Sequence, residues 1–160
     1  MTRRVVFLHG VGGSGSGMQP LAGALDLTGA ACPDGPEPFD MGPGRQWFSV
    51  KGVTETNRPD RIALALPGIR RMIESLGNPE ETVLVGFSQG AIMALHLAAA
   101  GLPVAGVVAI AGRLANPVPA RTDWPPIWVL HGDNDSVMPE AVDPGAGRPR
   151  RVPRARRAVP

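Results

Sequence analysis

Residues 82–95 read TVLVGFSQGAIMAL, and this segment indicates the architecture of the chain. Its first four residues are β-branched or apolar and predict a buried strand. Residues 91–95 are good helix formers, and the glycines between the two parts allow a sharp turn. A strand that passes directly into a helix is the repeating unit of α/β proteins, so we expect the remaining elements to follow the same pattern.

Apolar runs of strand length alternate with helical segments along the sequence. We predict strands at 5–9, 82–87, 104–110 and 127–131, a short strand near 30–32, and helices at 18–27, 61–76 and 89–100. Pro67 lies inside the second helix and is expected to kink or split it. Strands that are apolar on both faces and separated by helices indicate a mostly parallel sheet with helices on both faces.

The segment from Ala91 to Gly112 is apolar enough to suggest a membrane span, with His96 as its one strongly polar residue. Gly101-Leu102-Pro103 interrupts it, and the residues after this break are β-branched. We therefore interpret the segment as a buried helix followed by a buried strand, and we expect no membrane span.

Charge is distributed unevenly over the 160 residues, which carry a formal net charge of +2. Residues 143–160 hold six arginines and one aspartate, so residues 1–142 are mildly acidic. We expect an α/β domain over 1–142, without affinity for nucleic acid, and a disordered Arg/Pro-rich tail. Cys32 is the single cysteine, which excludes an internal disulfide, and the N-terminus lacks the apolar run of a signal peptide, so we expect a cytoplasmic protein.

Gly86-Phe87-Ser88-Gln89-Gly90 matches the G-x-S-x-G pattern of a nucleophile elbow. In such an elbow the serine hydroxyl is exposed at a turn, and the N-terminus of the following helix favours negative charge beside it. The glycine-rich segment 10–15 follows the first strand, where small residues let backbone N–H groups approach an acyl oxygen. We expect the N–H groups of Val11 and Gln89 to hold that oxyanion.

The same glycine-rich segment permits a second interpretation. Gly10-x-Gly12-x-x-Gly15 fits the dinucleotide-binding pattern, and Asp34 or Glu37 lies near the position of a ribose-binding acid. A nucleotide-binding α/β protein is therefore an alternative, although it leaves the motif around Ser88 unexplained.

Together these segments resemble the bacterial phospholipase/carboxylesterase family of small α/β-hydrolases, which includes acyl-protein-thioesterase-like esterases. The matching segments are LHGxGG at 8–13, GRQWFSV at 44–50, NRP at 57–59, GFSQGAIMAL at 86–95 and HGDxDxVxP at 131–139. The resemblance extends over about residues 4–142. It implies an α/β-hydrolase fold that hydrolyses small carboxylic esters or thioesters without a cofactor or metal. It also implies Ser88 as nucleophile, Asp135 as the acid of the triad, and the oxyanion hole described above.

The sequence departs from the family pattern after Asp135. The family places the triad histidine beyond this acid, whereas His9, His96 and His131 all precede it. We expect His9 to be structural, His96 to be packed or partly exposed, and His131 to brace its own loop. We expect the last strand and helix of the fold to be missing, with the tail in their place. A frameshift or truncation near residue 142 is one hypothesis, and a genuine polybasic tail is the other.

Without a histidine base the Ser88 hydroxyl stays protonated and attacks poorly. The expected function is therefore a serine esterase or thioesterase with impaired activity, and the alternative is a non-catalytic, truncated hydrolase. Met18, Trp47 and Phe48 are candidate walls of an acyl pocket, although core packing explains them equally well. The sequence leaves the acyl chain length and the oligomeric state open.

Overall fold

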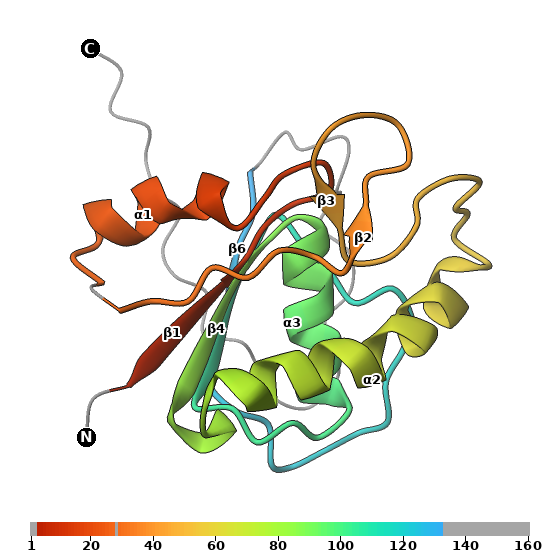
Figure 1. Ribbon diagram of the computed structural model, residues 1–160. Helices are drawn as coiled ribbons and strands as arrows, with labels where there is room; N and C mark the ends of the chain where they lie inside the picture. Colours follow the sequence, from red (N-terminus) through yellow and green to blue (C-terminus); the bar gives the residue numbers. More distant parts are fainter. Residues whose placement is uncertain (1–2, 28, 133–160) are drawn as a thin grey trace.

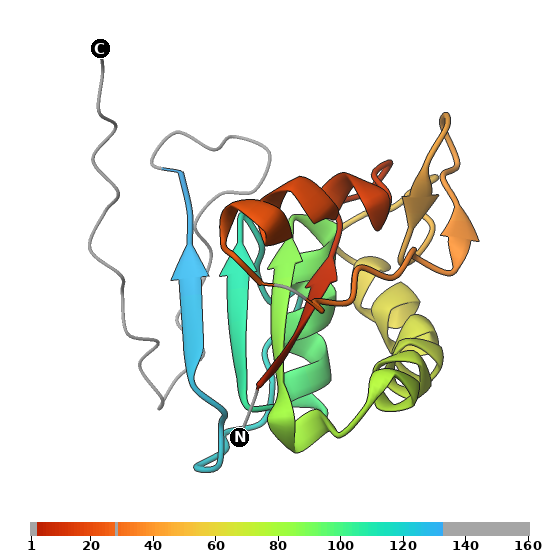
Figure 2. The same cartoon turned by 60° about the vertical axis from the view of Figure 1, so that its left-hand side comes forward.

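The computed structural model describes residues 3–27 and 29–132. Its main sheet has the strand order β1-β4-β5-β6, and all three neighbouring pairs are parallel. Figure 2 shows the four strands pointing the same way. Their bounds are β1 (Arg4–Leu8), β4 (Thr82–Phe87), β5 (Gly106–Ile110) and β6 (Ile127–Leu130). Beyond β1, an isolated parallel bridge joins Val6 to Ala31, where the sequence predicts a short strand.

Helices lie on both sides of this sheet (Figure 1). On one side is α1 (Gln19–Ala24), which follows a 3-10 turn, η1 (Ser16–Met18), and is shorter than the predicted helix at 18–27. On the other side are α2 (Arg58–Leu76) and α3 (Gln89–Ala99). A second 3-10 turn, η2 (Pro79–Glu81), precedes β4, and a small antiparallel hairpin joins β2 (Glu37–Pro38) to β3 (Arg45–Gln46).

Alternate residues of the strands enter two separate hydrophobic clusters, because successive side chains of a strand point to opposite faces. Val6 and Leu84 belong to the cluster that contains the buried residues of α2 and α3. Phe7 and Val85 pack with Ala22 of α1. The prediction of a mostly parallel sheet with helices on both faces is confirmed.

Helix α2 is continuous, so the expectation that Pro67 splits it is wrong. Proline cannot donate a hydrogen bond to the carbonyl group of Ala63, four residues earlier. Both residues are exposed, so the missing hydrogen bond lies on the side of α2 that faces away from the core. The buried side chains of Ile62, Ile69 and Ile73 anchor the helix to the core before and after the proline.

The apolar segment 91–112 folds as α3 and β5, and the predicted helix and strand are confirmed. Residues 89–98 are all buried, which explains why this helix carries almost no polar face. Within the described ranges, no helix is both long and apolar enough to cross a membrane.

The carboxyl ends of the four parallel strands meet at one edge of the sheet. Leu8 and Phe87 end β1 and β4 there, and the glycine-rich segment and Ser88 follow them directly. The predicted acid Asp135 and the predicted tail at 143–160 lie outside the described residues.

Candidate active site

Ser88 occupies the turn between β4 and α3. Its backbone angles are φ 52° and ψ −115°, which non-glycine residues rarely adopt. The Ser88 N–H donates to the Ile110 carbonyl oxygen at 2.9 Å, and the Ile92 N–H donates to the Ser88 carbonyl oxygen at 3.1 Å. The turn is therefore held by both β5 and the first turn of α3. The hydroxyl makes no capping hydrogen bond to α3, and strain maintained at such a position is typical of functional sites.

Close packing requires the two glycines that flank Ser88. A Cβ atom on Gly86 would lie 2.4 Å from the carbonyl oxygen of Gly90, and a Cβ atom on Gly90 would lie 2.1 Å from that of Leu8. Both obstacles are backbone atoms, which cannot rotate away as a side chain can. The glycines therefore allow the start of α3 to lie directly against the end of β1.

The glycine-rich segment after β1 consequently lies beside Ser88. A Cβ atom on Gly10 would be 3.4 Å from the Ser88 Cβ and 3.0 Å from the Phe87 ring. The segment turns sharply here, because the Gly13 N–H donates to the Gly10 carbonyl oxygen at 3.0 Å. Two parts of the sequence more than 70 residues apart thus meet at Ser88.

Val11 and Gln89 each keep a backbone N–H that donates to no acceptor in the part of the chain that the structure describes. Val11 lies in the exposed turn that follows Gly10. Gln89 is the first residue of α3, where helical N–H groups have no partner within the helix. Free backbone N–H donors in the segments next to Ser88 are the kind of group that stabilises an oxyanion.

The side chain of Gln89 is buried, and both ends of its amide group are hydrogen-bonded. Its Oε1 accepts from the Trp47 N–H, and its Nε2 donates to the Phe48 carbonyl oxygen, each at 2.8 Å. Trp47 also donates from its indole Nε1 to the His9 carbonyl oxygen at 2.7 Å. No local sequence pattern predicts these contacts, since they join residues 38 to 42 positions apart.

Met18, Trp47 and Phe48 do not come together as the wall of one pocket. Trp47 and Phe48 are buried in the cluster beneath α2 and α3. Met18 packs against Phe7 and Val85 on the opposite face of the sheet. Their shared role in an acyl pocket stays a prediction, and this placement favours core packing instead.

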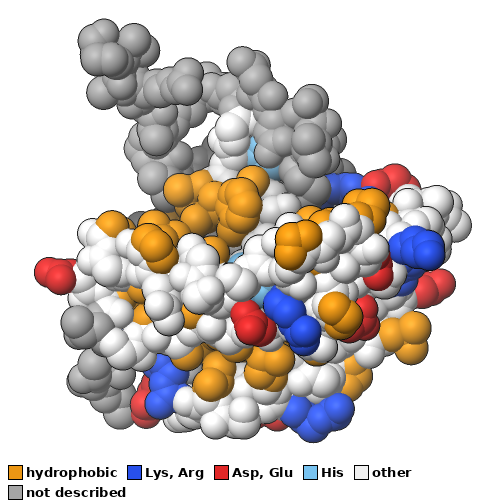
Figure 3. Space-filling model, turned by 45° about the horizontal axis from the view of Figure 1, so that its top comes forward, with side chains coloured by type: hydrophobic (Ala, Val, Ile, Leu, Met, Phe, Trp, Pro, Cys, Tyr) orange, Lys and Arg blue, Asp and Glu red, His pale blue; other side chains and the backbone are white. Residues whose placement is uncertain are grey.

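Three apolar side chains, to which the sequence assigned no role, are exposed at the carboxyl edge. The exposed fractions are 46% for Phe87 and 37% for both Val11 and Leu130. Figure 3 views the molecule toward this edge and shows hydrophobic side chains gathered there. Phe87 immediately precedes Ser88, and its position inside the G-x-S-x-G motif is the signal that could have identified it.

His9 has the structural role that the sequence predicts. It is buried, its Nε2 accepts from the Gly35 N–H at 2.9 Å, and its Nδ1 lies 2.7 Å from the Gly10 carbonyl oxygen. An acceptor role for Nε2 places the ring proton on Nδ1, which donates to Gly10. With both nitrogens engaged, the ring has no free nitrogen to accept a proton from Ser88.

His96 is packed inside the protein. Its Nε2 accepts from the Ala115 N–H at 3.0 Å, and burial lowers its pKa to about 4. It follows Ser88 by eight residues in α3, or about 12 Å along the helix axis. His131 follows β6, and β5 separates that strand from the one that carries Ser88.

The Asp34 carboxylate is hydrogen-bonded within the protein, and this does not favour the nucleotide-binding alternative. Its Oδ1 accepts from the Gly15 N–H at 2.7 Å, so the acid and the glycine-rich segment bind each other. Among residues 3–27 and 29–132, no group of three or more His, Cys, Asp or Glu side chains could hold a metal ion.

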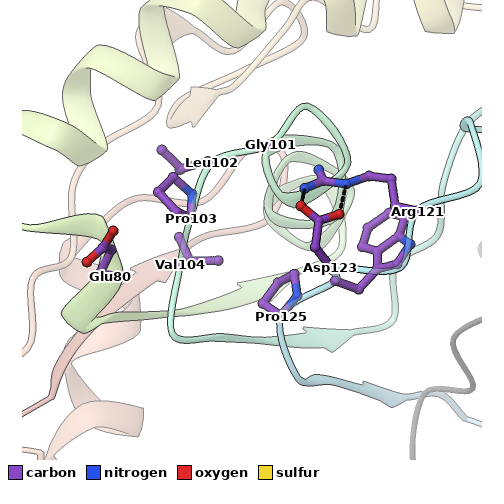
Figure 4. Close-up of a pocket in the computed structure, with 9 residues that line it drawn as sticks. Glu80, Gly101, Leu102, Pro103, Val104, Arg121, Asp123 and Pro125 are labelled. Carbon is purple, nitrogen blue, oxygen red and sulfur yellow. Dashed lines mark hydrogen bonds and ion pairs between the residues drawn. The ribbon is translucent and has the colours of Figure 1, made fainter.

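A hollow of about 370 Å³ lies away from Ser88 (Figure 4). Its lining residues Glu80, Val104 and Pro125 precede β4, β5 and β6, which places the hollow at the amino edge of the sheet. Arg121 binds Asp123 there at 2.8 Å and also donates to the Ala98 carbonyl oxygen at the end of α3. These contacts hold the loop between β5 and β6 against the end of α3.

Comparisons with known proteins agree with this geometry. The profile of a family described as Phospholipase/Carboxylesterase matches residues 1–144. The chain is 37% identical over 110 residues to Esterase YpfH of Escherichia coli (strain K12), covering 65% of the chain and 47% of that protein. It is 28% identical to Acyl-protein thioesterase 1 of Saccharomyces cerevisiae (strain ATCC 204508 / S288c), covering 84% of the chain and 71% of that protein. The chain thus spans about half the length of the first of these relatives.

A solved structure shows the same fold. The crystal structure of esterase PE8 superposes with a TM-score of 0.76 and 28% sequence identity. The match covers 87% of this chain and 72% of the other. The fold is therefore the α/β-hydrolase fold.

Proposed function

Because this chain belongs to the phospholipase/carboxylesterase family, we propose that it is a serine hydrolase that forms an acyl-enzyme on Ser88. Its substrates in this proposal are small carboxylic esters or thioesters. One observation carries the proposal: Ser88 has φ 52° at a strand-to-helix turn, directly beside the glycine-rich segment that follows β1. An ordinary polar turn needs neither the strained backbone nor the packing of Gly90 against Leu8.

In the proposed reaction the Ser88 oxygen attacks the carbonyl carbon of the substrate. The carbonyl oxygen becomes an oxyanion, and the N–H groups of Val11 and Gln89 donate to it. The bond to the alcohol or thiol leaving group then breaks, which leaves an acyl group on Ser88. Water attacks this ester, releases the carboxylic acid and restores the hydroxyl group.

The proton of Ser88 needs an acceptor. In the proposal Asp135 orients a histidine base, but no histidine follows Asp135 within these 160 residues. His9 and His96 are occupied by the hydrogen bonds described above. We therefore propose that this 160-residue chain, used alone, reacts slowly and depends mainly on its oxyanion hole.

The proposal extends to the domain organisation and the compartment of the chain. The hydrolase domain extends over residues 1–142, residues 143–160 form a tail outside it, and the protein acts in the cytoplasm. A non-catalytic hydrolase scaffold is the second candidate, favoured by the absence of a histidine after Asp135 in this sequence.

Labelling with a fluorophosphonate probe distinguishes the two candidates. Mass spectrometry of the digested protein is expected to find the probe on Ser88, and Ser88→Ala is expected to abolish labelling. Ser75→Ala removes a hydroxyl in α2 that is bonded to the Met72 carbonyl oxygen, so this control is expected to label normally. Hydrolysis of 4-nitrophenyl butyrate, followed in parallel, reports turnover. Equal labelling of the wild type and Ser88→Ala would overturn the proposal.

A further inference from the structure

The two halves of the proposed oxyanion hole come from segments that are distant in sequence, and Trp47 is hydrogen-bonded to both. We propose that Trp47 is a positioning residue that fixes the Val11 N–H relative to the Gln89 N–H. This inference rests on the function proposed above and reassigns Trp47 from the wall of an acyl pocket to the support of the site.

The first half is held through the indole ring. Trp47 Nε1 donates to the His9 carbonyl oxygen at 2.7 Å, and the two ring centroids are 5.1 Å apart. The same carbonyl group precedes Gly10, which leads directly into Val11. The His9 ring is held in turn by the Gly35 N–H, which donates to its Nε2. The chain that leads to the Val11 N–H is therefore held both at the His9 carbonyl group and at the His9 ring.

The second half is held through the backbone of Trp47. Its N–H donates to Gln89 Oε1, and the amide of Gln89 returns a hydrogen bond to the Phe48 carbonyl oxygen, each at 2.8 Å. A side-chain amide that is bonded at both ends cannot rotate. The residue that carries the second oxyanion donor is thus fixed to the same short segment as the first.

Burial makes this arrangement rigid. Trp47 is completely buried, and His9, Phe48 and Gln89 are at most 3% exposed. A broken hydrogen bond in this network would leave a polar group without water or another partner, and such a state is unfavourable. The network therefore restricts the motion of the Val11 N–H relative to the Gln89 N–H. The packing of Gly90 against Leu8 does not by itself orient these two groups.

The rate of Ser88 phosphonylation measures this positioning. In this reaction the Ser88 oxygen bonds to phosphorus, fluoride leaves, and the proton of the hydroxyl group passes to water. The phosphonyl oxygen takes the place of the substrate carbonyl oxygen in the oxyanion hole. The rate constant at saturating probe therefore depends on the two N–H groups, whereas the half-saturating probe concentration depends mainly on ground-state binding.

Trp47→Phe removes the indole N–H and retains an aromatic ring. We expect the saturating rate constant to fall by about tenfold to a hundredfold, as small misplacements of catalytic groups do, with little change in the half-saturating concentration. Trp124→Phe is the matched control, because Trp124 lines the hollow at the opposite edge of the sheet. It is expected to label at the wild-type rate.

Further measurements separate a folding defect from a positioning defect. Thermal unfolding of each variant reports whether it is folded. If Trp47→Phe does not fold, 3-benzothienylalanine at position 47 replaces only the indole N–H by sulfur, and the same loss of rate is expected. A folded variant at position 47 that labels as fast as the wild type overturns the positioning role alone. Absence of probe from wild-type Ser88 overturns the proposed function and this inference with it.

Discussion

The carbonyl oxygen of Leu8 lies 2.1 Å from the position that a Cβ atom on Gly90 would take. This close approach joins the first strand to the helix that follows Ser88. It also places a severe steric limit on one residue of the G-x-S-x-G motif, because the obstacle is a backbone atom of β1, a strand that is paired with β4 along its whole length.

Gly90→Ala is therefore expected to destabilise the protein, although alanine is normally the better helix former. Either β1 or α3 must shift, and we expect the free energy of unfolding to fall by about 2 kcal/mol or more. Urea denaturation measures this loss. Phosphonylation of Ser88 is expected to slow as well, since the same shift separates Ser88 from Gly10. An unchanged urea midpoint would contradict the packing described here.

Gly68→Ala is expected to have the opposite effect on stability. Gly68 lies in the exposed interior of α2, and the nearest atom to an added Cβ is the Arg71 guanidinium at 3.9 Å. Replacing glycine in a helix interior reduces the backbone entropy lost on folding, so we expect a gain of about 0.5–1 kcal/mol. The same urea titration checks it, and labelling of Ser88 is expected to stay at the wild-type rate.

His96 is expected to make stability depend on pH in a definite window. In the unfolded chain this side chain takes up a proton near pH 6.5, whereas burial lowers its pKa in the folded protein to about 4. Between these values the unfolded state binds more protons, so the free energy of unfolding falls as the pH is lowered from 6.5 to 4. The expected loss is about 3 kcal/mol.

His96→Gln tests this assignment. Glutamine can still accept from the Ala115 N–H but does not titrate in this range. Urea denaturation at pH 7.5, 6.5, 5.5 and 4.5 is expected to show a smaller loss for the variant than for the wild type. Parallel pH profiles for the two proteins would show that His96 does not cause the dependence.

Asp40 holds the loop that leads from Trp47 toward α2. Its Oδ2 accepts from the Ser49 hydroxyl and the Val50 N–H at 2.8 Å, and from the Lys51 N–H at 3.0 Å. The hydrogen bond from Ser49, then the Gln46 side chain, and then the two backbone N–H groups lower the pKa of Asp40 to about 2. The carboxylate form is therefore the one that holds the loop, and this contribution is lost as the pH falls from about 3.8 through 2.

Asp40→Ala is expected to increase hydrogen exchange at the amides of Val50 and Lys51 by about tenfold, because both N–H groups lose an ionised acceptor. Exchange at neutral pH measured by NMR checks this. Asp60→Ala removes an exposed carboxylate from the first turn of α2 and serves as the control. Equal exchange in the two variants would show that Asp40 does not hold the loop.

Local sequence order predicted the elements around Ser88 closely. β4 and α3 begin where the sequence placed them, because each depends on neighbouring residues: a β-branched run, a glycine-flanked turn and a run of helix formers. The expectation that Pro67 splits its helix was wrong for the complementary reason. Whether a proline divides a helix depends on which side faces solvent and what anchors the other, and no window of sequence around residue 67 contains that information.

The candidate site residues likewise divide into those that a local motif predicts and those that only tertiary contacts reveal. The identity of Ser88 as the candidate nucleophile followed from a five-residue motif, and the roles of Val11 and Gln89 remain predictions that their free N–H groups support. The assignment of Trp47 did not follow from any motif. An aromatic side chain is apolar enough for either a pocket or a core, and only its contacts distinguish the two.

The amino-acid sequence was sufficient to predict the strand-to-helix turn at Ser88 and the alternation of strands and helices. Folding was needed to bring Trp47 between His9 and Gln89, 38 and 42 residues away. The physical reason is that a turn is specified by the dihedral preferences of adjacent residues. Hydrogen bonds between distant segments form only once burial of the sheet faces has placed their donors and acceptors together.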